Sequence, residues 1–197
     1  IVAGVEEYDS GKLSMGNTVK ICYLPQTPVF GEEETVLQAA VRGIISDTDQ
    51  WTMEAEAKSM LNQLGFSDYE EKMSHMSGGQ KKRVALVNAL LTPADILVLD
   101  EPTNHLDNAM SEWLEEYLIR FRGAILMVTH DRYFLNRITN QIVEVDRGKL
   151  FVSRGNYSEY LEQKAQREAD AEARERKNRT LYRQELEWMR RGVRARG

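Results

Sequence analysis

The stretch ILVLDEP, residues 96–102, joins an uninterrupted apolar run to two adjacent carboxylates. Such a run is typical of a strand buried in a parallel sheet. Asp100 and Glu101 would then follow the strand at its carboxyl end, which is where open α/β sheets bind their ligands. In phosphoryl transfer to water, the first carboxylate would hold Mg²⁺ and the second would orient or deprotonate the attacking water. Taken alone, an Asp-Glu pair more often ends a strand in solvent, so this interpretation depends on its surroundings.

The segments around this stretch predict a βαβ unit. Apolar residues recur at helical spacing from Met110 to Phe121, and a second apolar run covers residues 124–128. The carboxyl ends of parallel strands meet at one edge of a sheet, so we expect His130, which follows the second run, beside the carboxylate pair. Gln26 closes an earlier predicted strand over residues 19–24, where its amide could bridge a metal ion and a water.

A glycine turn opens another predicted helix. Ser77-Gly78-Gly79-Gln80 precedes a segment whose apolar residues recur at helical spacing from Val84 to Leu91. Two glycines let a ligand approach the backbone closely, and the N–H groups of a helix N-terminus form an anion site. A turn capped by Ser77 explains the same residues without a ligand. The basic run Lys81-Lys82-Arg83 either adds positive potential or forms a solvated face, which is the commoner case.

Composition and charge exclude several classes of protein. The 197 residues, 42% hydrophobic and 29% charged, suffice for one domain plus an appendage. The single cysteine, Cys22, rules out a disulfide framework, favours a reducing compartment and is predicted to be buried. No apolar stretch of the sequence approaches the roughly 20 residues that span a bilayer, so we expect a cytoplasmic protein. Residues 172–197 carry nine Lys or Arg against four Asp or Glu, which suggests a separate partner for that end.

The remaining pattern completes an α/β fold. Helices are predicted over residues 35–43 and 52–64, and a hairpin over residues 142–152. From Tyr157 onward the chain is nearly all helix formers and charges, with a narrow apolar stripe, which indicates an extended helix. The Gly-Lys pair of GVEEYDSGKLS, residues 4–14, does not form a phosphate-binding loop. Six residues rather than four separate its glycines, and a leucine stands where a hydroxyl is needed.

Four motifs, taken in order, resemble those of the ATP-binding cassette superfamily. YLPQ (23–26) resembles its Q-loop, MSGGQKKRVAL (76–86) its signature motif, ILVLDEP its Walker B strand and VTHD (128–131) its His switch. The resemblance covers residues 1 to about 155. It implies a P-loop NTPase-type cassette, with a partial RecA-like parallel sheet and a helical subdomain over about residues 30–92.

The resemblance also implies roles for individual residues, with ATP and Mg²⁺ as cofactors. Asp100 and Gln26 would lie at the metal, while Glu101 would activate water and His130, with Gln26, would sense the γ-phosphate. The remaining positions would face the ATP of a second cassette or the interface with it: Ser77, Gly78, Gly79, Gln80 and Asp107.

Three further motifs are similar to the ABC-F branch, whose members are ATPases with two cassettes in one chain that act on ribosomes. These motifs are TNHLD (103–107), HDRYFLN (130–136) and GNYSEYLEQK (155–164). WMRRGVRAR (188–196) resembles the helix that leaves the first cassette in bacterial factors of the Uup and YfmR type. Residues 156–197 would then begin the linker between cassettes, which lies beside ribosomal RNA and tRNA, and no membrane partner is expected.

The family pattern includes segments that this sequence does not contain. A Walker A loop should precede Ile1, with residues 1–11 matching the helix and turn after it, so we expect residues 1–197 alone to be inactive. Residues 35–64 leave room for little beyond the helical subdomain, so the long arm of many ABC-F proteins is not expected. Two other functions stay open, a transporter ATPase and a non-enzymatic binding or assembly module. TNHLD and the charged C-terminal helix speak against the first.

Overall fold

A computed structural model of the chain describes residues 1–44 and 50–194, with side chains to residue 190. It contains two compact units, Ile1–Phe134 and Leu135–Gly197. Residues 45–49, which fall inside the predicted helical subdomain, and residues 195–197 of the predicted linker lie outside the described part. The division into a cassette to residue 155 and a linker from 156 stays a prediction.

The first unit is built on a parallel sheet of three strands in the order β1-β2-β3. The strands are β1 (Ile21–Leu24), β2 (Ile96–Asp100) and β3 (Ala124–Val128). Leu24 is paired with Leu99, and Asp100 with Val128, so all three strands end at one edge of the sheet. The predicted parallel α/β fold is therefore confirmed, with the first strand starting two residues later than expected.

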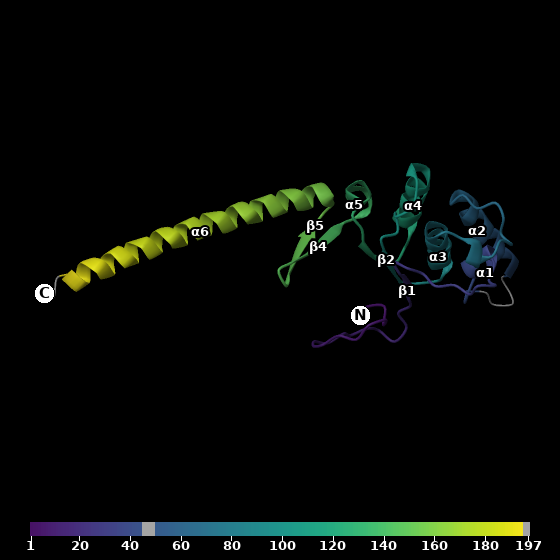
Figure 1. The fold of residues 1–197 in the computed structure, drawn as a ribbon, viewed down its shortest axis with the longest axis horizontal. Coiled ribbons are helices and arrows are strands. Elements are labelled where there is room, and N and C mark those ends of the chain that lie inside the picture. The colour runs from purple at the N-terminus through teal and green to yellow at the C-terminus, as the bar shows by residue number, and fades with distance from the viewer. Residues whose placement is uncertain (45–49, 195–197) are drawn as a thin grey trace. The chain divides into compact units, whose positions relative to one another are not determined.

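Three helices gather on one side of this unit in Figure 1. They are α1 (Val36–Ala40), α2 (Gln50–Gln63) and α3 (Gly78–Leu91), with the short 3-10 helix η1 (Met73–His75) leading into α3. The apolar face of α3 is buried against the other two helices and β1. The helix predicted over residues 35–43 is shorter, because it ends at Ala40 before Gly43, whose φ of +76° interrupts helical geometry.

Helix α4 (Asn108–Arg120) is the crossover between β2 and β3, which confirms the predicted βαβ unit. It buries Leu114 and Leu118, and the hydroxyl of Tyr117 donates to the carbonyl of Leu90 at 2.8 Å, which joins α4 to α3. The chain then turns at Gly123, where a Cβ atom would lie 2.4 Å from the carbonyl oxygen of Asp95. Only glycine fits at that turn without displacing the backbone.

Residues 1–11 were expected to contain a helix and the turn after it, and the helix is wrong. Residues 1–20 form turns and bends and contain neither helix nor strand. Most of their side chains are exposed, and Gly4 and Gly11 have φ values of +73° and +112°. A short helix is not stable in water without an apolar face packed on a core, and the side chains of this segment are mostly exposed. Cys22, predicted to be buried, is only half-buried, although burial raises the pKa of its thiol.

The second unit contains an antiparallel hairpin and a long helix. Helix α5 (Arg132–Ile138) runs across the boundary between the units. The hairpin is formed by β4 (Gln141–Asp146) and β5 (Lys149–Arg154), and α6 follows over Tyr157–Arg194. Arg147 and Gly148 turn the hairpin with positive φ values of 47° and 73°. Both the predicted hairpin and the predicted long helix are confirmed.

A cluster of charges fastens the first turns of α6 to the hairpin. The carboxylate of Glu144 accepts hydrogen bonds from Lys164 and Arg167. The guanidinium of Arg167 also lies 4.0 Å from the ring centroid of Phe151. Tyr160 is buried, and its hydroxyl lies 3.4 Å from Nζ of Lys164. The bond from Lys164, reinforced by Arg167, holds the pKa of Glu144 below its usual value, although burial opposes the shift.

This cluster predicts a pH dependence for the packing of α6. A carboxylate whose pKa is lower in the folded state stabilises the fold above its unfolded pKa, and that contribution is lost as the pH falls through the folded value. We expect Glu144→Gln to lower the hydrogen-exchange protection of residues 157–167 at pH 7. The difference from the unaltered protein should shrink below about pH 4. The control is Glu172→Gln, which removes an exposed pair with Arg176 and should change this protection little. An equal loss of protection in both variants would contradict the role of Glu144 in holding α6 to the hairpin.

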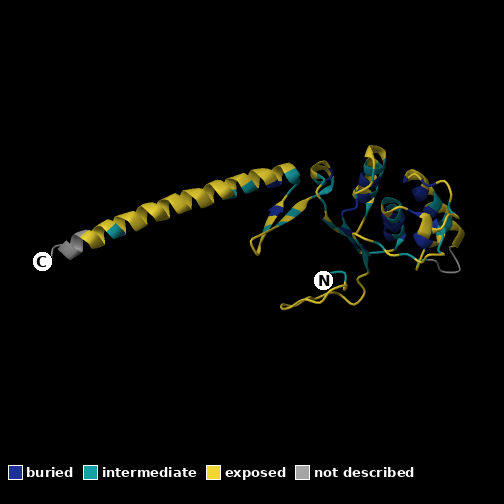
Figure 2. Ribbon diagram, in the orientation of Figure 1, coloured by how far each residue is buried: buried dark blue, intermediate teal, exposed yellow. Residues whose placement is uncertain are grey.

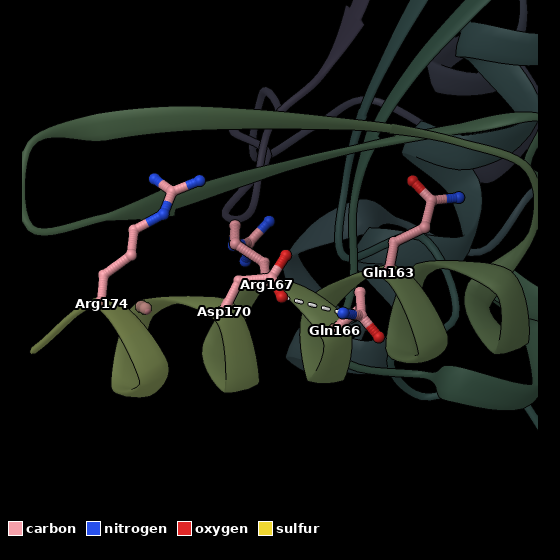
Figure 3. Close-up of a pocket in the computed structure, with 6 residues that line it drawn as sticks. Gln163, Gln166, Arg167, Asp170 and Arg174 are labelled. Carbon is pink, nitrogen blue, oxygen red and sulfur yellow. Dashed lines mark hydrogen bonds between the residues drawn. The ribbon is translucent and has the colours of Figure 1, made fainter. Parts of the chain in front are cut away.

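Beyond this cluster α6 is almost entirely exposed, as Figure 2 shows in yellow. Side chains from successive turns line a shallow hollow of about 420 Å³ (Figure 3): Gln163, Gln166, Arg167, Asp170, Ala171 and Arg174. Gln166 donates to Asp170 at 2.9 Å within it. Across the described residues, no helix has a stretch both long and apolar enough to cross a membrane.

Candidate active site

The carboxyl edge of the sheet brings together the residues predicted for catalysis. Asp100 is the last residue of β2 and Glu101 follows it, while Gln26 and His130 each come two residues after the ends of β1 and β3. The strand register places all of these positions on one edge. The expected neighbourhood is therefore present in the first unit, whereas the chemical role of each residue stays a prediction.

Glu101 and His130 differ sharply in their environments. Glu101 is only 7% exposed, has a φ of +49°, and donates its backbone N–H to the carbonyl of Val128 at 2.8 Å. Its Oε1 lies 3.6 Å from Nε2 of His130, whose side chain is 98% exposed. A positive φ is unusual for glutamate and is associated with functional positions. The carboxylate is thus fixed by its surroundings, while the imidazole is open to a ligand.

Two threonines connect the loops after β2 and β3. The hydroxyls of Thr103 and Thr129 lie 3.3 Å apart, and Oγ1 of Thr129 also accepts the N–H of Asp131 at 3.1 Å. These bonds hold the backbone on both sides of His130. The sequence did not predict a role for either threonine, although both lie within the motifs TNHLD and VTHD. A hydroxyl that positions a loop leaves no recognisable pattern in the sequence.

Lys82 differs from the commoner expectation of a solvated basic face. It is only 4% exposed, and its ammonium donates to the carbonyl of Pro25 at 2.7 Å and to the carbonyl of Asp100 at 2.6 Å. Burial lowers the pKa of Lys82, against the opposing charges of Asp100 and Glu101. Its spacing in the sequence could have indicated its burial, because Lys82 lies one helical turn before the buried Leu86, on the same face of α3.

The N-terminus of α3 is closed by a capping box. Oγ of Ser77 accepts the N–H of Gln80 at 3.3 Å, and Oε1 of Gln80 accepts the N–H of Ser77 at 2.9 Å. A Cβ atom on Gly78 would meet nothing within 4 Å, so this backbone is open to a ligand. A Cβ atom on Gly79 would lie 3.1 Å from Cβ of His105, which itself has a φ of +67°. The glycine turn therefore touches the turn that follows Glu101.

Asp107 is the N-cap of α4, because its Oδ1 accepts the N–H of Met110 at 2.9 Å. Capping of α4 accounts for an aspartate at this position without any second cassette, so the place of Asp107 at an interface remains a prediction.

The residues at the sheet edge fit a magnesium ion that arrives with a nucleotide. Mg²⁺ is usually bound through one or two protein oxygens together with substrate phosphates and waters. Asp100 and Gln26 offer a carboxylate and an amide at that edge. Within the described residues, no group of three or more His, Cys, Asp or Glu is placed to hold a metal ion.

Comparison with known families matches most of the chain. A family model described as ABC transporter matches residues 3–104, and an extension model with the same description matches residues 143–196. The first covers the parallel sheet to β2 with α1, α2 and α3, and the second covers most of the hairpin and α6.

Curated relatives are similar over the whole chain. The ABC transporter ATP-binding protein YfmR of Bacillus subtilis is 39% identical over 232 residues, covering 100% of this chain and 37% of YfmR. The energy-dependent translational throttle protein EttA is 43% identical in Mycobacterium tuberculosis and 35% in Escherichia coli, with 41% and 42% of those proteins covered. The chain thus spans about two fifths of their length. The alignments also exceed the 197 residues of this chain, so the relatives carry extra residues within the aligned span.

Solved structures agree on the fold. The archaeal ribosome recycling factor aABCE1, solved with the stalk protein aP1, has a TM-score of 0.60 at 28% identity, with 75% of this chain and 29% of that chain covered. An ATP-binding subunit of an ABC transporter has a TM-score of 0.57 at 26% identity, with 68% and 59% covered. Given the family match over more than half of its residues, the chain belongs to the ABC transporter family of ATP-binding proteins.

Proposed function

We propose that this chain is an ATP-hydrolysing cassette of an ABC-F protein that acts on the ribosome. The observation that carries the proposal is the sheet edge, where a buried Glu101 lies 3.6 Å from an exposed His130 and directly after Asp100. Support for the ribosome comes from the relatives, since EttA is named as a translational throttle and aABCE1 as a ribosome recycling factor. Such a protein would act in the cytoplasm.

In this proposal each residue at the edge has a separate task. Asp100 and Gln26 would hold Mg²⁺, which would neutralise charge on the phosphates. Glu101 would orient the attacking water and accept its proton, and its burial keeps the carboxylate in one position. His130 would donate a hydrogen bond to the terminal phosphate, for which its exposed ring is well placed. These tasks match hydrolysis of a phosphoanhydride.

The remaining predicted residues need a second cassette. Gly78 and Gly79 would offer backbone N–H groups to ATP held by that cassette, with Ser77 and Gln80 fixing the turn and Asp107 near the interface. We assign the phosphate-binding loop to a segment outside this sequence, because GVEEYDSGKLS lacks its spacing. Residues 1–197 alone would then bind ATP too weakly for turnover. The basic end of α6 would extend as the linker towards ribosomal RNA and tRNA.

The proposal predicts nucleotide-dependent ribosome binding by the full-length protein. We expect it to hydrolyse ATP, and to cosediment with ribosomes more strongly with a non-hydrolysable ATP analogue than with ADP. Raising the salt concentration should weaken cosedimentation, because counterion release makes contacts with nucleic acid salt-dependent.

A second candidate is the ATPase subunit of a transporter, which the family description and the similar transporter subunit favour. Association with membranes in the same fractionation, without ribosome binding in any nucleotide state, would support the transporter and contradict the ribosomal proposal.

A further inference from the structure

Lys82 connects α3 to both strand ends that carry predicted catalytic residues. Its ammonium donates to the carbonyls of Pro25 and Asp100 at 2.7 and 2.6 Å. The first carbonyl belongs to the peptide unit that continues into Gln26, and the second to the peptide unit that continues into Glu101. A single side chain therefore holds the two peptide units from which Gln26 and Glu101 extend.

Filling the core does not explain a lysine at this position. The neighbouring buried positions of α3, such as Leu86 and Val87, are apolar, and burial of an ammonium is costly unless its donors are satisfied. The ammonium of Lys82 donates its hydrogen bonds to two neutral backbone carbonyls rather than to a carboxylate. The carboxylates of Asp100 and Glu101 act on the Lys82 ammonium through space, and in the described part of the chain no ion pair joins Lys82 to either of them.

We propose that Lys82 is a positioning residue for ATP hydrolysis, which fixes the separation of the peptide units preceding Gln26 and Glu101. The inference rests on the proposed function, since it assigns Lys82 a role in the reaction at that edge. Because reacting groups must be held within about 1 Å, loss of the two bonds should slow turnover while leaving ATP affinity nearly unchanged.

The test compares three variants of the full-length protein. Lys82→Met keeps most of the unbranched side chain and removes its donors. Lys82→Arg keeps donors and charge, and Lys81→Met removes a charge from the half-exposed neighbouring position. For each protein, kcat and KM are measured with Mg-ATP, and ATP bound without Mg²⁺ gives the number of competent sites. We expect Lys82→Met to lower kcat per site about 10- to 100-fold with KM changed less than about threefold. Lys82→Arg should retain more activity, and Lys81→Met should match the unaltered protein.

Two results would overturn this role. Equal kcat per site in Lys82→Met and Lys81→Met would show that the bonds do not position the reaction. A parallel loss of ATP sites and turnover, with unchanged kcat per remaining site, would make Lys82 a structural residue only. If Lys82→Met does not fold, Lys82→Arg tests the role instead. Because a planar guanidinium does not reproduce the geometry of an ammonium, its kcat per site should fall at least about threefold while its ATP sites remain. Absence of ATP hydrolysis in the unaltered protein would instead overturn the proposed function itself.

Discussion

Replacing Glu101 by Gln in the full-length protein is expected to lower ATP turnover by about 10²- to 10⁴-fold and to leave ATP binding intact. Glutamine keeps the size of the side chain but cannot accept a proton from water. The backbone of Glu101 is held by its bond to Val128, and its side chain is almost fully buried. The substitution should therefore change the chemistry of the site more than its shape.

The measurement is steady-state ATP turnover beside equilibrium binding of ATP. Glu116→Gln is a matched control, because Glu116 is an exposed residue of α4 whose carboxylate pairs with Arg120 one turn away. We expect that variant to hydrolyse ATP at the rate of the unaltered protein. Unchanged turnover in Glu101→Gln would remove the role assigned to Glu101, and loss of ATP binding would show that its carboxylate supports the nucleotide instead.

The sequence was sufficient where a local pattern determines the structure. The run before Asp100 is typical of a buried strand, and the amphipathic helix that follows indicates that the next run lies parallel to it. The same logic predicted Asp100, Glu101 and His130 at one edge, and Gln26 was expected at the end of an earlier strand. Capping by Ser77 was one of two explanations of its turn, and the structure adds Gln80, three residues later, as the second half of a capping box.

The sequence was insufficient where a residue depends on contacts far along the chain. The ammonium of Lys82 donates to the carbonyls of Pro25 and Asp100, which lie 57 and 18 residues away in the sequence. Lys82 also belongs to a run of basic residues, and such runs normally face solvent. Contact between Gly79 and His105 likewise depends on how two turns meet. The helix expected within residues 1–11 is wrong for the opposite reason, because a local match to a family helix was not accompanied by packing of these mostly exposed residues.

The contact between Gly79 and His105 carries the last prediction, that Gly79→Val lowers ATP turnover by about 10²-fold. A Cβ atom at Gly79 would lie 3.1 Å from Cβ and Cγ of His105, and valine adds two methyl groups beyond it. Cβ of His105 is fixed by its backbone, so a change of rotamer can move Cγ but cannot relieve the contact with Cβ. The turn from Glu101 to Leu106 is closed by its own backbone bonds, so it should move as a unit and displace Glu101.

The test measures ATP turnover of Gly79→Val alone and of the double variant with His105→Gly. It distinguishes two effects of the valine, which are its contact with His105 and its blocking of a ligand at the N-terminus of α3. Glycine adopts the φ of +67° at position 105 freely and removes the overlapping atoms, so the double variant should recover most of the lost turnover. Gly78→Ala is the control for stability and should melt like the unaltered protein, because its Cβ atom would meet nothing within 4 Å. If the double variant stays as slow as Gly79→Val, the valine acts by blocking a ligand at the N-terminus of α3. The contact with His105 would then be incidental, and access of a ligand to the backbone of Gly78 and Gly79 would be what matters for hydrolysis.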